Sequence, residues 1–226
     1  MTKKIAFKTI GCRLNLFETD SLVSEFSKKD YQIVDFAEKA DVYVINTCTV
    51  TSMSDQKSRR VINQAGRKKE DGITIVTGCM ATNYKEQLEK NENIDYVVDN
   101  DHKTSVLSIA EAHFKGEAVA DEDFQKDLFN YEPAEETLHT RSFIKIQDGC
   151  DNFCTFCIIP KVRGRATSRP VEDVLNNIKK VVEFGYKEII ITGVNIGRYN
   201  HEGVDFEALV EQRLEIPGDF RIRISS

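Results

Sequence analysis

The sequence has little of what membrane-spanning and secreted proteins carry. Its 226 residues contain no run that approaches the ~18 apolar residues of a membrane span. Positive charge opens the chain at Lys3 and Lys4, but Lys8 and Arg13 interrupt the residues that follow, so no apolar core of a signal peptide appears. We therefore expect a cytoplasmic protein without membrane contact, whose six cysteines are ligands or free thiols rather than disulfides.

An overall positive charge is also missing. The formal net charge of −6 does not suggest a nucleic-acid binder, although a sum can hide how charge is distributed. Residues 52–69 carry six basic side chains against one acidic one, and residues 141–170 carry six against two. Residues 117–136 carry eight acidic side chains against Lys126. We interpret 117–140 as an acidic linker between a first domain of residues 1–116 and a second of residues 141–226.

Histidine spacing typical of a metal site is absent as well, because the four histidines lie far apart. We interpret them as surface or packing residues; they are His102, His113, His139 and His201. Three cysteines, in contrast, occur within eight residues, at Cys150, Cys154 and Cys157. A zinc site usually closes with four ligands, whereas three thiolates on a four-iron cube leave one iron open to a substrate or cofactor. A three-cysteine zinc site completed from elsewhere, or thiols with a packing role, are the alternatives.

The first half of the chain alternates strand-like and helical segments. Apolar runs at 4–10, 32–36, 42–45, 73–76 and 96–98 predict strands, with helices between them and Gly116 as the stop of a helix over 105–114. Continuously apolar strands of this kind predict a doubly wound parallel sheet. Cys12, Cys48 and Cys79 each follow a strand, so we expect them to meet at one sheet edge. Three such thiols indicate a second cluster, although a lone cysteine there is most often a small buried apolar residue.

Four motifs together resemble a known family. They are Gly11-Cys12-Arg13-Leu14-Asn15 with Glu18, Asn46-Thr47-Cys48-Thr49-Val50-Thr51, Thr77-Gly78-Cys79, and the CxxxCxxC spacing of Cys150, Cys154 and Cys157. They resemble the methylthiotransferases, which are radical S-adenosylmethionine (SAM) enzymes with two [4Fe-4S] clusters. The resemblance implies an auxiliary cluster on Cys12, Cys48 and Cys79, and a SAM-binding cluster on the other three. It places Phe156 beside the adenine of SAM.

The second domain is expected to be an incomplete radical SAM barrel. A helix begins near Pro170 and stops before Gly185, and a strand over 188–192 leads into Gly193 and Asn195. A helix then covers 206–214, and a third strand covers 221–224. By resemblance, Gly193 and Asn195 lie near SAM, although an ordinary turn between strand and helix is the alternative. The family has a six-stranded partial barrel, so we expect three strands with an open edge and uncovered apolar inner faces.

The resemblance also implies partners and a substrate. The motif around Cys48, followed by Asp55 to Arg59, looks most like the branch that modifies threonylcarbamoyladenosine beside the tRNA anticodon, and an electron donor would reduce the cluster. Isopentenyladenosine or a ribosomal protein are alternative acceptors, and a noncatalytic Fe–S or RNA-binding fragment is a third hypothesis. Arg163, Arg165 and Arg169 could position phosphates or the modified base; a solvated basic loop is the alternative.

Overall fold

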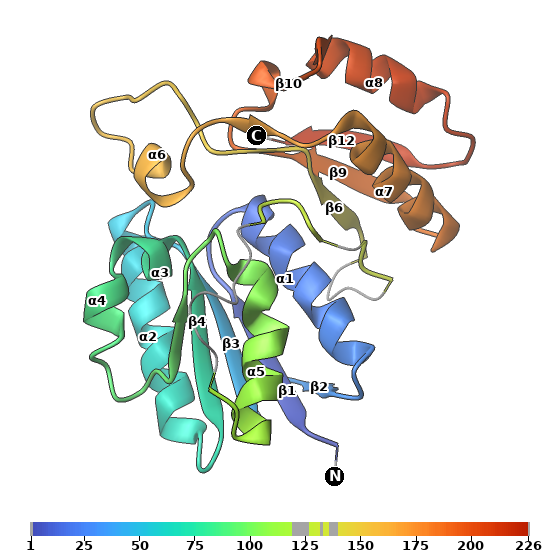
Figure 1. Ribbon diagram of the computed structural model, residues 1–226. Coiled ribbons are helices and arrows are strands. Elements are labelled where there is room, and N and C mark those ends of the chain that lie inside the picture. Colours follow the sequence, from blue (N-terminus) through green and yellow to red (C-terminus); the bar gives the residue numbers. More distant parts are fainter. Residues whose placement is uncertain (1, 119–126, 132, 136–139, 226) are drawn as a thin grey trace.

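The first α/β unit is built on a five-stranded sheet. The computed structural model describes residues 2–118, 127–131, 133–135 and 140–225. The strands are β1 (Lys4–Thr9), β2 (Gln32–Val34), β3 (Val42–Thr47), β4 (Ile73–Gly78) and β5 (Tyr96–Val98). They lie in the order β2-β1-β3-β4-β5 and are all parallel, as the alternation of strands and helices predicts (Figure 1).

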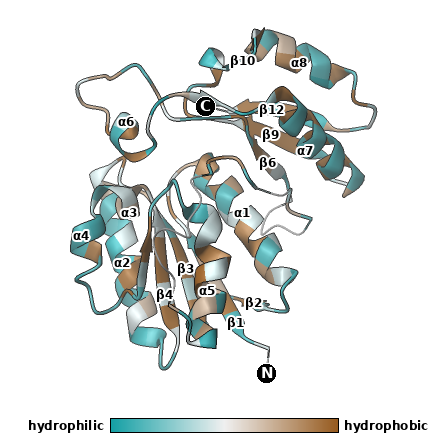
Figure 2. Cartoon of the chain, viewed as in Figure 1, coloured by the Kyte–Doolittle hydropathy of each residue, from teal (hydrophilic) through white to brown (hydrophobic). Residues whose placement is uncertain are grey.

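Helices cover both faces of this sheet. On one face pack α1 (Arg13–Ser27) and, after the short turn η1 (Lys103–Ser105), α5 (Val106–Lys115). On the other pack α2 (Ser52–Lys68), α3 (Cys79–Asn83) and α4 (Lys85–Leu88). The strands between them are largely hydrophobic (Figure 2), and every residue of β3 and β4 is buried. Gly116 ends α5 with φ of +72°, a conformation that glycine adopts without strain.

The second unit has a three-stranded parallel sheet in the order β12-β9-β6. Its strands are β6 (Ser142–Lys145), β9 (Glu188–Thr192) and β12 (Arg221–Ser225), and α7 (Val171–Glu183) and α8 (Phe206–Leu214) share one core with it. Short elements that the sequence did not predict are α6 (Ile159–Val162), η3 (Ile196–Arg198), and the pairs β7 (Gln147–Asp148) with β8 (Thr167–Ser168) and β10 (Asn200–His201) with β11 (Val204–Asp205). The predicted fold class is confirmed.

The inner face of the second sheet is not the bare apolar surface that we expected. Phe143 of β6 and Ile190 of β9 are buried against Phe17 of α1 and Tyr131. In β12, Ile222 belongs to the core on the helix side, so the alternating positions Arg221 and Arg223 turn to the inner face. The first unit therefore covers part of the half-barrel, and the rest of its inner face is polar.

The expected acidic linker falls partly outside the described residues, which leave out 119–126, 132 and 136–139. Its described part contacts the folded units, since Tyr131 is 3% exposed and Tyr186 donates to the carbonyl oxygen of Glu135 at 3.3 Å. Over the described ranges, none of the helices combines the length and apolarity that a membrane crossing requires.

Candidate functional site at two cysteine-bearing edges

The first-unit cysteines (Cys12, Cys48 and Cys79) converge because their strands are neighbours. Cys48 and Cys79 directly follow β3 and β4, and Cys12 caps α1 three residues after β1. Since β1, β3 and β4 are adjacent and parallel, their carboxyl ends meet at one sheet edge. Residues 36 and 31 positions apart in the sequence thus share one side of the molecule, the side that faces the second unit (Figure 1).

A cavity of about 650 Å³ holds these three side chains. Ile159, Arg163, Thr192 and Gly193 of the second unit also line it. Cys12 is exposed, whereas Cys48 and Cys79 are buried. Among the described residues, no three His, Cys, Asp or Glu side chains come close enough to share one metal ion. A four-iron cube does not need that, because each thiolate binds a different iron, so three separated thiols around one cavity fit such a cluster.

Two glycines let the cysteine loops pack closely. A Cβ added to Gly11, whose φ is +108°, would stand 2.6 Å from Cys48 Cβ and 2.8 Å from its Sγ. A Cβ on Gly78, whose φ is +97°, would stand 2.3 Å from the carbonyl oxygen of Thr47. Both positions combine a backbone that favours glycine with a contact that excludes any side chain. The glycines next to Cys12 and Cys79 therefore fix where these thiols lie.

Buried amides and a hydroxyl hold the same loops. Asn15 Nδ2 donates to the carbonyl oxygens of Ile10 at 2.8 Å and Thr47 at 3.0 Å, which joins the first two cysteine loops. Ser58 Oγ donates to the carbonyl oxygen of Cys48 at 2.9 Å and accepts from its N–H at 3.2 Å. Because each buried donor is satisfied by a loop carbonyl, the cavity wall is preorganised.

Asn100 reaches both the first-unit thiols and the second unit. Its Nδ2 lies 3.6 Å from Cys79 Sγ and donates to the carbonyl oxygen of Val162 in α6 at 2.7 Å. Burial raises the pKa of the Cys79 thiol, and the positive charges of Arg163 and Lys103 act against that rise. Two buried cations and one amide donor thus face the place where a thiolate would bind iron.

A buried ionic cluster joins the two units. Glu18 of α1, 2% exposed, accepts from Lys103, from Lys145 Nζ at 3.0 Å and from Arg163 Nη1 at 3.2 Å. Burial alone would raise the pKa of Glu18, but Arg163, Lys103 and Lys145 hold it well below its usual value. One carboxylate of the first unit thus binds two cations of the second.

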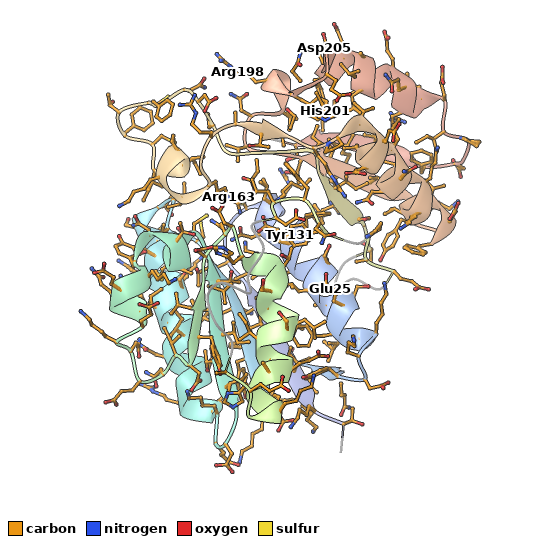
Figure 3. The ribbon with its side chains drawn as sticks, in the orientation of Figure 1. Glu25, Tyr131, Arg163, Arg198, His201 and Asp205 are labelled. Atoms are coloured by element: carbon orange, nitrogen blue, oxygen red, sulfur yellow. The ribbon has the colours of Figure 1, made fainter. Side chains whose placement is uncertain are left out.

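Arg163 is the centre of this cluster and lies between the two units (Figure 3). Its Nη1 is 2.9 Å from Asp148 Oδ2, and its Nη2 donates to Asn15 Oδ1 at 2.6 Å. Lys145 Nζ also reaches Asp148 Oδ2 at 2.9 Å. Asp148 accepts in turn from the N–H of Gly149 at 2.8 Å, directly before Cys150. The guanidinium therefore connects the first cysteine cavity to the start of the second cysteine loop.

The loop cysteines (Cys150, Cys154 and Cys157) lie between β7 and α6. Cys154 and Cys157 are exposed and Cys150 is half-buried, and a turn is closed by the Cys157 N–H donating to the Cys154 carbonyl oxygen at 2.9 Å. A Cβ on Gly149 would stand 2.0 Å from the carbonyl oxygen of Arg165, so the two ends of the loop touch there. Phe156 is 92% exposed, available to pack on a bound cofactor. Three accessible thiols on one short loop fit a cluster.

Gly193 and Asn195 contact the strand that precedes this loop. A Cβ on Gly193 would stand 3.0 Å from the carbonyl oxygen of Gln147. The N–H of Asn195 donates to Gln147 Oε1 at 2.7 Å, while Gln147 Nε2 donates to the carbonyl oxygens of Asp148 and Gly149, both at 2.8 Å. The turn after β9 thus supports the entry to the cysteine loop, and Gly193 also lines the first cavity.

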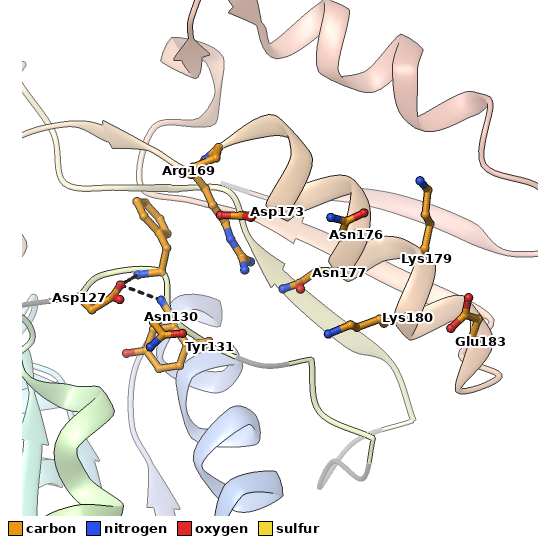
Figure 4. Close-up of a pocket in the computed structure, with 12 residues that line it drawn as sticks. Asp127, Asn130, Tyr131, Arg169, Asp173, Asn176, Asn177, Lys179, Lys180 and Glu183 are labelled. Atoms are coloured by element: carbon orange, nitrogen blue, oxygen red, sulfur yellow. Dashed lines mark hydrogen bonds between the residues drawn. The ribbon is translucent and has the colours of Figure 1, made fainter.

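The three arginines that we expected at a substrate have different surroundings. Only Arg165 is exposed, and its guanidinium pairs with Asp151 at 2.7 Å and lies over the Phe153 ring. Arg163 and Arg169 are 3% and 4% exposed. Arg169 lines a separate hollow between α7 and Tyr131 (Figure 4), where the amide oxygen of Asn177 accepts from it at 2.8 and 2.9 Å. Arg165 is thus the one of the three that is open to solvent, and substrate binding by these arginines stays a prediction.

Sequence reasoning missed most of the residues that hold the site. They are Asn100 and Lys103 in one stretch and Lys145 and Asp148 in another, and these two stretches meet only in the folded protein. One signal in the sequence was available: Lys145 interrupts an apolar run. Because charged residues are rarely buried without a partner, a lysine in a buried strand indicates an ion pair. Of the expected non-ligand histidines, His113 bonds Tyr96 and His102 bonds Asp99, while His139 lies outside the described residues.

Two family matches divide the chain. Residues 4–99 match the uncharacterized protein family UPF0004, and residues 144–226 match the radical SAM superfamily. The solved structure of the radical SAM methyltransferase TsrM from Kitasatospora setae, with cobalamin and a [4Fe-4S] cluster bound, superposes with a TM-score of 0.57 at 14% identity, covering 94% of this chain and 51% of that one. At that identity the likeness shows the fold alone. The chain thus carries a UPF0004 match ahead of a radical SAM match.

Curated relatives narrow that class. Threonylcarbamoyladenosine tRNA methylthiotransferase MtaB of Aquifex aeolicus is 39% identical, over 99% of this chain and 56% of the relative. The tRNA-2-methylthio-N(6)-dimethylallyladenosine synthase of Bacteroides thetaiotaomicron is 31% identical, over 99% of this chain and 52% of the relative. Over almost its whole length the chain is similar to radical SAM methylthiotransferases, which confirms the predicted resemblance. It spans about half the length of these relatives.

Proposed function

We propose that this chain is the two-cluster part of a tRNA methylthiotransferase that acts on C2 of threonylcarbamoyladenosine at position 37, next to the anticodon. The observation that carries the proposal is the shared wall of the two cysteine sites. Arg163 and Ile159, which follow the loop cysteines, line the cavity of the first-unit cysteines. Such an arrangement suits an enzyme in which a radical centre and a sulfur donor act on one substrate atom.

The residues divide into two ligand sets. The loop cysteines would hold the cluster that binds SAM, with Phe156 against the adenine, and the first-unit cysteines would hold the auxiliary cluster. When bound, the cofactors supply the radical that takes hydrogen from the substrate and the methylated sulfur that replaces it. The chain's own task is positioning: Gly11 and Gly78 place two thiols, and Gln147 ties the SAM loop to Asn195. An external electron donor in the cytoplasm completes the system.

The choice of threonylcarbamoyladenosine draws on the motif around Cys48 and on the Aquifex aeolicus relative, which carries that substrate in its name. The competing acceptor is isopentenyladenosine, since the Bacteroides thetaiotaomicron relative acts on the dimethylallyl form of adenosine by its name. Mass spectrometry of tRNA nucleosides from cells that lack the complete gene separates the two. We expect loss of the methylthio form of threonylcarbamoyladenosine only; its normal level would refute the substrate assignment.

A noncatalytic Fe–S or RNA-binding role is the second candidate. Anaerobic reconstitution followed by SAM cleavage distinguishes it. An enzyme core should form 5′-deoxyadenosine when reduced, whereas a binding fragment should not. Because the chain spans about half of its relatives, methylthiolation itself is to be measured on the complete protein.

A further inference from the structure

A basic trough runs along α2 away from the cysteine cavity. It consists of two adjoining hollows of about 670 Å³ each, which share Arg60 and Gln64. The hollow that Lys57 and Met53 line, called the upper hollow, shares Gly11, Thr51 and Ser54 with the cavity of the first-unit cysteines. The trough is therefore continuous with the proposed reaction site, and α2 carries it from the edge that faces the second unit down the side of the first sheet (Figure 1).

Five cations line this trough: Lys8 of β1, and Lys57, Arg60, Arg67 and Lys68 of α2, of which Lys68 donates to the carbonyl oxygens of Phe36 and Ala37. Lys57, Arg60 and Arg67 follow one another at helical spacing and are all exposed. They span about 15 Å along the axis, at 1.5 Å per residue. None of the three forms an ion pair with a described residue, and Asp55, the acidic residue of α2, is taken by Arg59 on another side of the helix. On a chain of net charge −6, a row of unpaired cations is a local exception to the overall charge.

Apolar side chains stand at the junction of trough and cavity. Val50, which lines the cavity, is 47% exposed, and Met53, which lines the upper hollow, is 67% exposed. Nonspecific binders of single-stranded nucleic acid combine a positively charged groove for the backbone with aromatic side chains on which unstacked bases stack. Here the positively charged groove is present, and an exposed aliphatic pair stands in place of aromatic side chains at the end where a base would leave the backbone for the reaction site.

We propose that the α2 trough binds the sugar–phosphate backbone of the RNA strand that carries the target base, with Lys57, Arg60 and Arg67 each contacting phosphates. This inference rests on the proposed function, because it takes tRNA as the substrate. RNA fits better than a protein or a membrane because a row of three exposed cations on one helix, without ion-pair partners among the described residues, suits a line of phosphates. The exposed pair Val50 and Met53 receives the unpaired base.

The test is binding of an anticodon stem-loop RNA to the 226-residue chain, by fluorescence anisotropy at several salt concentrations. Each phosphate contact contributes about 0.7–0.9 to the slope of log K against log salt. The triple variant Lys57→Ala/Arg60→Ala/Arg67→Ala should reduce the magnitude of that slope by about two to three. It should also weaken binding by at least about tenfold near 0.1 M salt. The control Lys28→Ala/Lys29→Ala/Lys115→Ala removes three exposed cations at the ends of α1 and α5, the helices on the opposite face of the sheet from α2, and should change affinity less than about twofold.

A single-residue comparison sharpens the result. Arg59 and Arg60 are adjacent on α2, but Arg59 is paired with Asp55 and lies over the Tyr84 ring. Arg60→Ala should therefore reduce the salt slope by about one, and Arg59→Ala should leave it nearly unchanged.

Equal effects of the two triples, or no RNA binding by the chain, would overturn the proposed trough. So would loss of binding to phosphatidylserine vesicles, rather than to RNA, in the trough variant. These outcomes leave the proposed function standing, because that is tested separately by the tRNA nucleosides and by SAM cleavage.

Discussion

The ionic cluster between the two units makes a quantitative prediction about Glu18. Its carboxylate accepts from Lys103, Lys145 and Arg163 in a place that is 2% exposed. Among these described groups, Asp148 is the other carboxylate, so Glu18→Met leaves three buried cations facing one anion. Removing one partner from a buried ionic group costs about 3–5 kcal/mol, a large part of the ~5–15 kcal/mol that stabilises a domain.

Lys103→Met should lower the free energy of unfolding much less than Glu18→Met does, because Glu18 keeps two of its three cations. The double variant Glu18→Met/Lys103→Met removes one charge of each sign and replaces both side chains by an apolar one of similar length. Since apolar replacement of a whole buried pair is often nearly neutral, we expect the double variant to recover at least about 1 kcal/mol relative to Glu18→Met alone. The coupling between the two substitutions measures their interaction.

Urea unfolding of the apoprotein, followed by circular dichroism, measures these free energies. Because Glu18 contacts both units, its loss should also separate one unfolding transition into two. A cost below about 1 kcal/mol for Glu18→Met, with a single unchanged transition, would refute the conclusion that this cluster holds the units together.

Other substitutions test the cysteine sites. Gly11→Ala should lower the free energy of unfolding by about 1–3 kcal/mol because of the backbone conformation at that position. It should also displace Cys48 and so reduce the amount of bound iron. The control in the iron analysis is Gly197→Ala, whose added Cβ meets no atom within 4 Å. In the complete protein, Cys154→Ala should abolish SAM cleavage, whereas Cys48→Ala should retain uncoupled cleavage without methylthio product; product at the parent rate would contradict the role of the first unit. Asn100→Leu should make the auxiliary cluster's potential more negative in a redox titration, because a donor 3.6 Å from Cys79 Sγ is lost. The lowered pKa of Glu18 means that its contribution to stability is present above pH ~4.3 and is lost as the pH falls through the folded value, so acid unfolding should depend less on pH in Glu18→Met.

The sequence was most informative where one local pattern decides the structure. Continuously apolar strands predicted the parallel sheet, and the strand ends predicted that Cys12, Cys48 and Cys79 would meet. Both follow from geometry that every parallel α/β sheet shares, so no knowledge of distant contacts was needed.

Burial of charged groups could not be read in the same way. Arg163 stands in a stretch with Lys161 and Arg165 that looks like a solvated basic loop, yet it is enclosed by Glu18 and Asp148. Its partners come from positions 145 and 15 residues away, and only the docking of the two units brings them together. The prediction of an apolar inner face for β12 was wrong because side chains alternate along the strand, which puts Arg221 and Arg223 on that face.

The number of iron atoms per chain tests the central claim most directly. After anaerobic reconstitution the chain should bind about eight iron atoms, as two four-iron clusters. Replacing either the first-unit cysteines or the loop cysteines by alanine should leave about four, and only the variant that retains the loop cysteines should show a change in its electron paramagnetic resonance spectrum when SAM is added. About four irons in the parent chain, unchanged when the first-unit cysteines are replaced, would contradict a second cluster in the cavity at the edge of the first sheet.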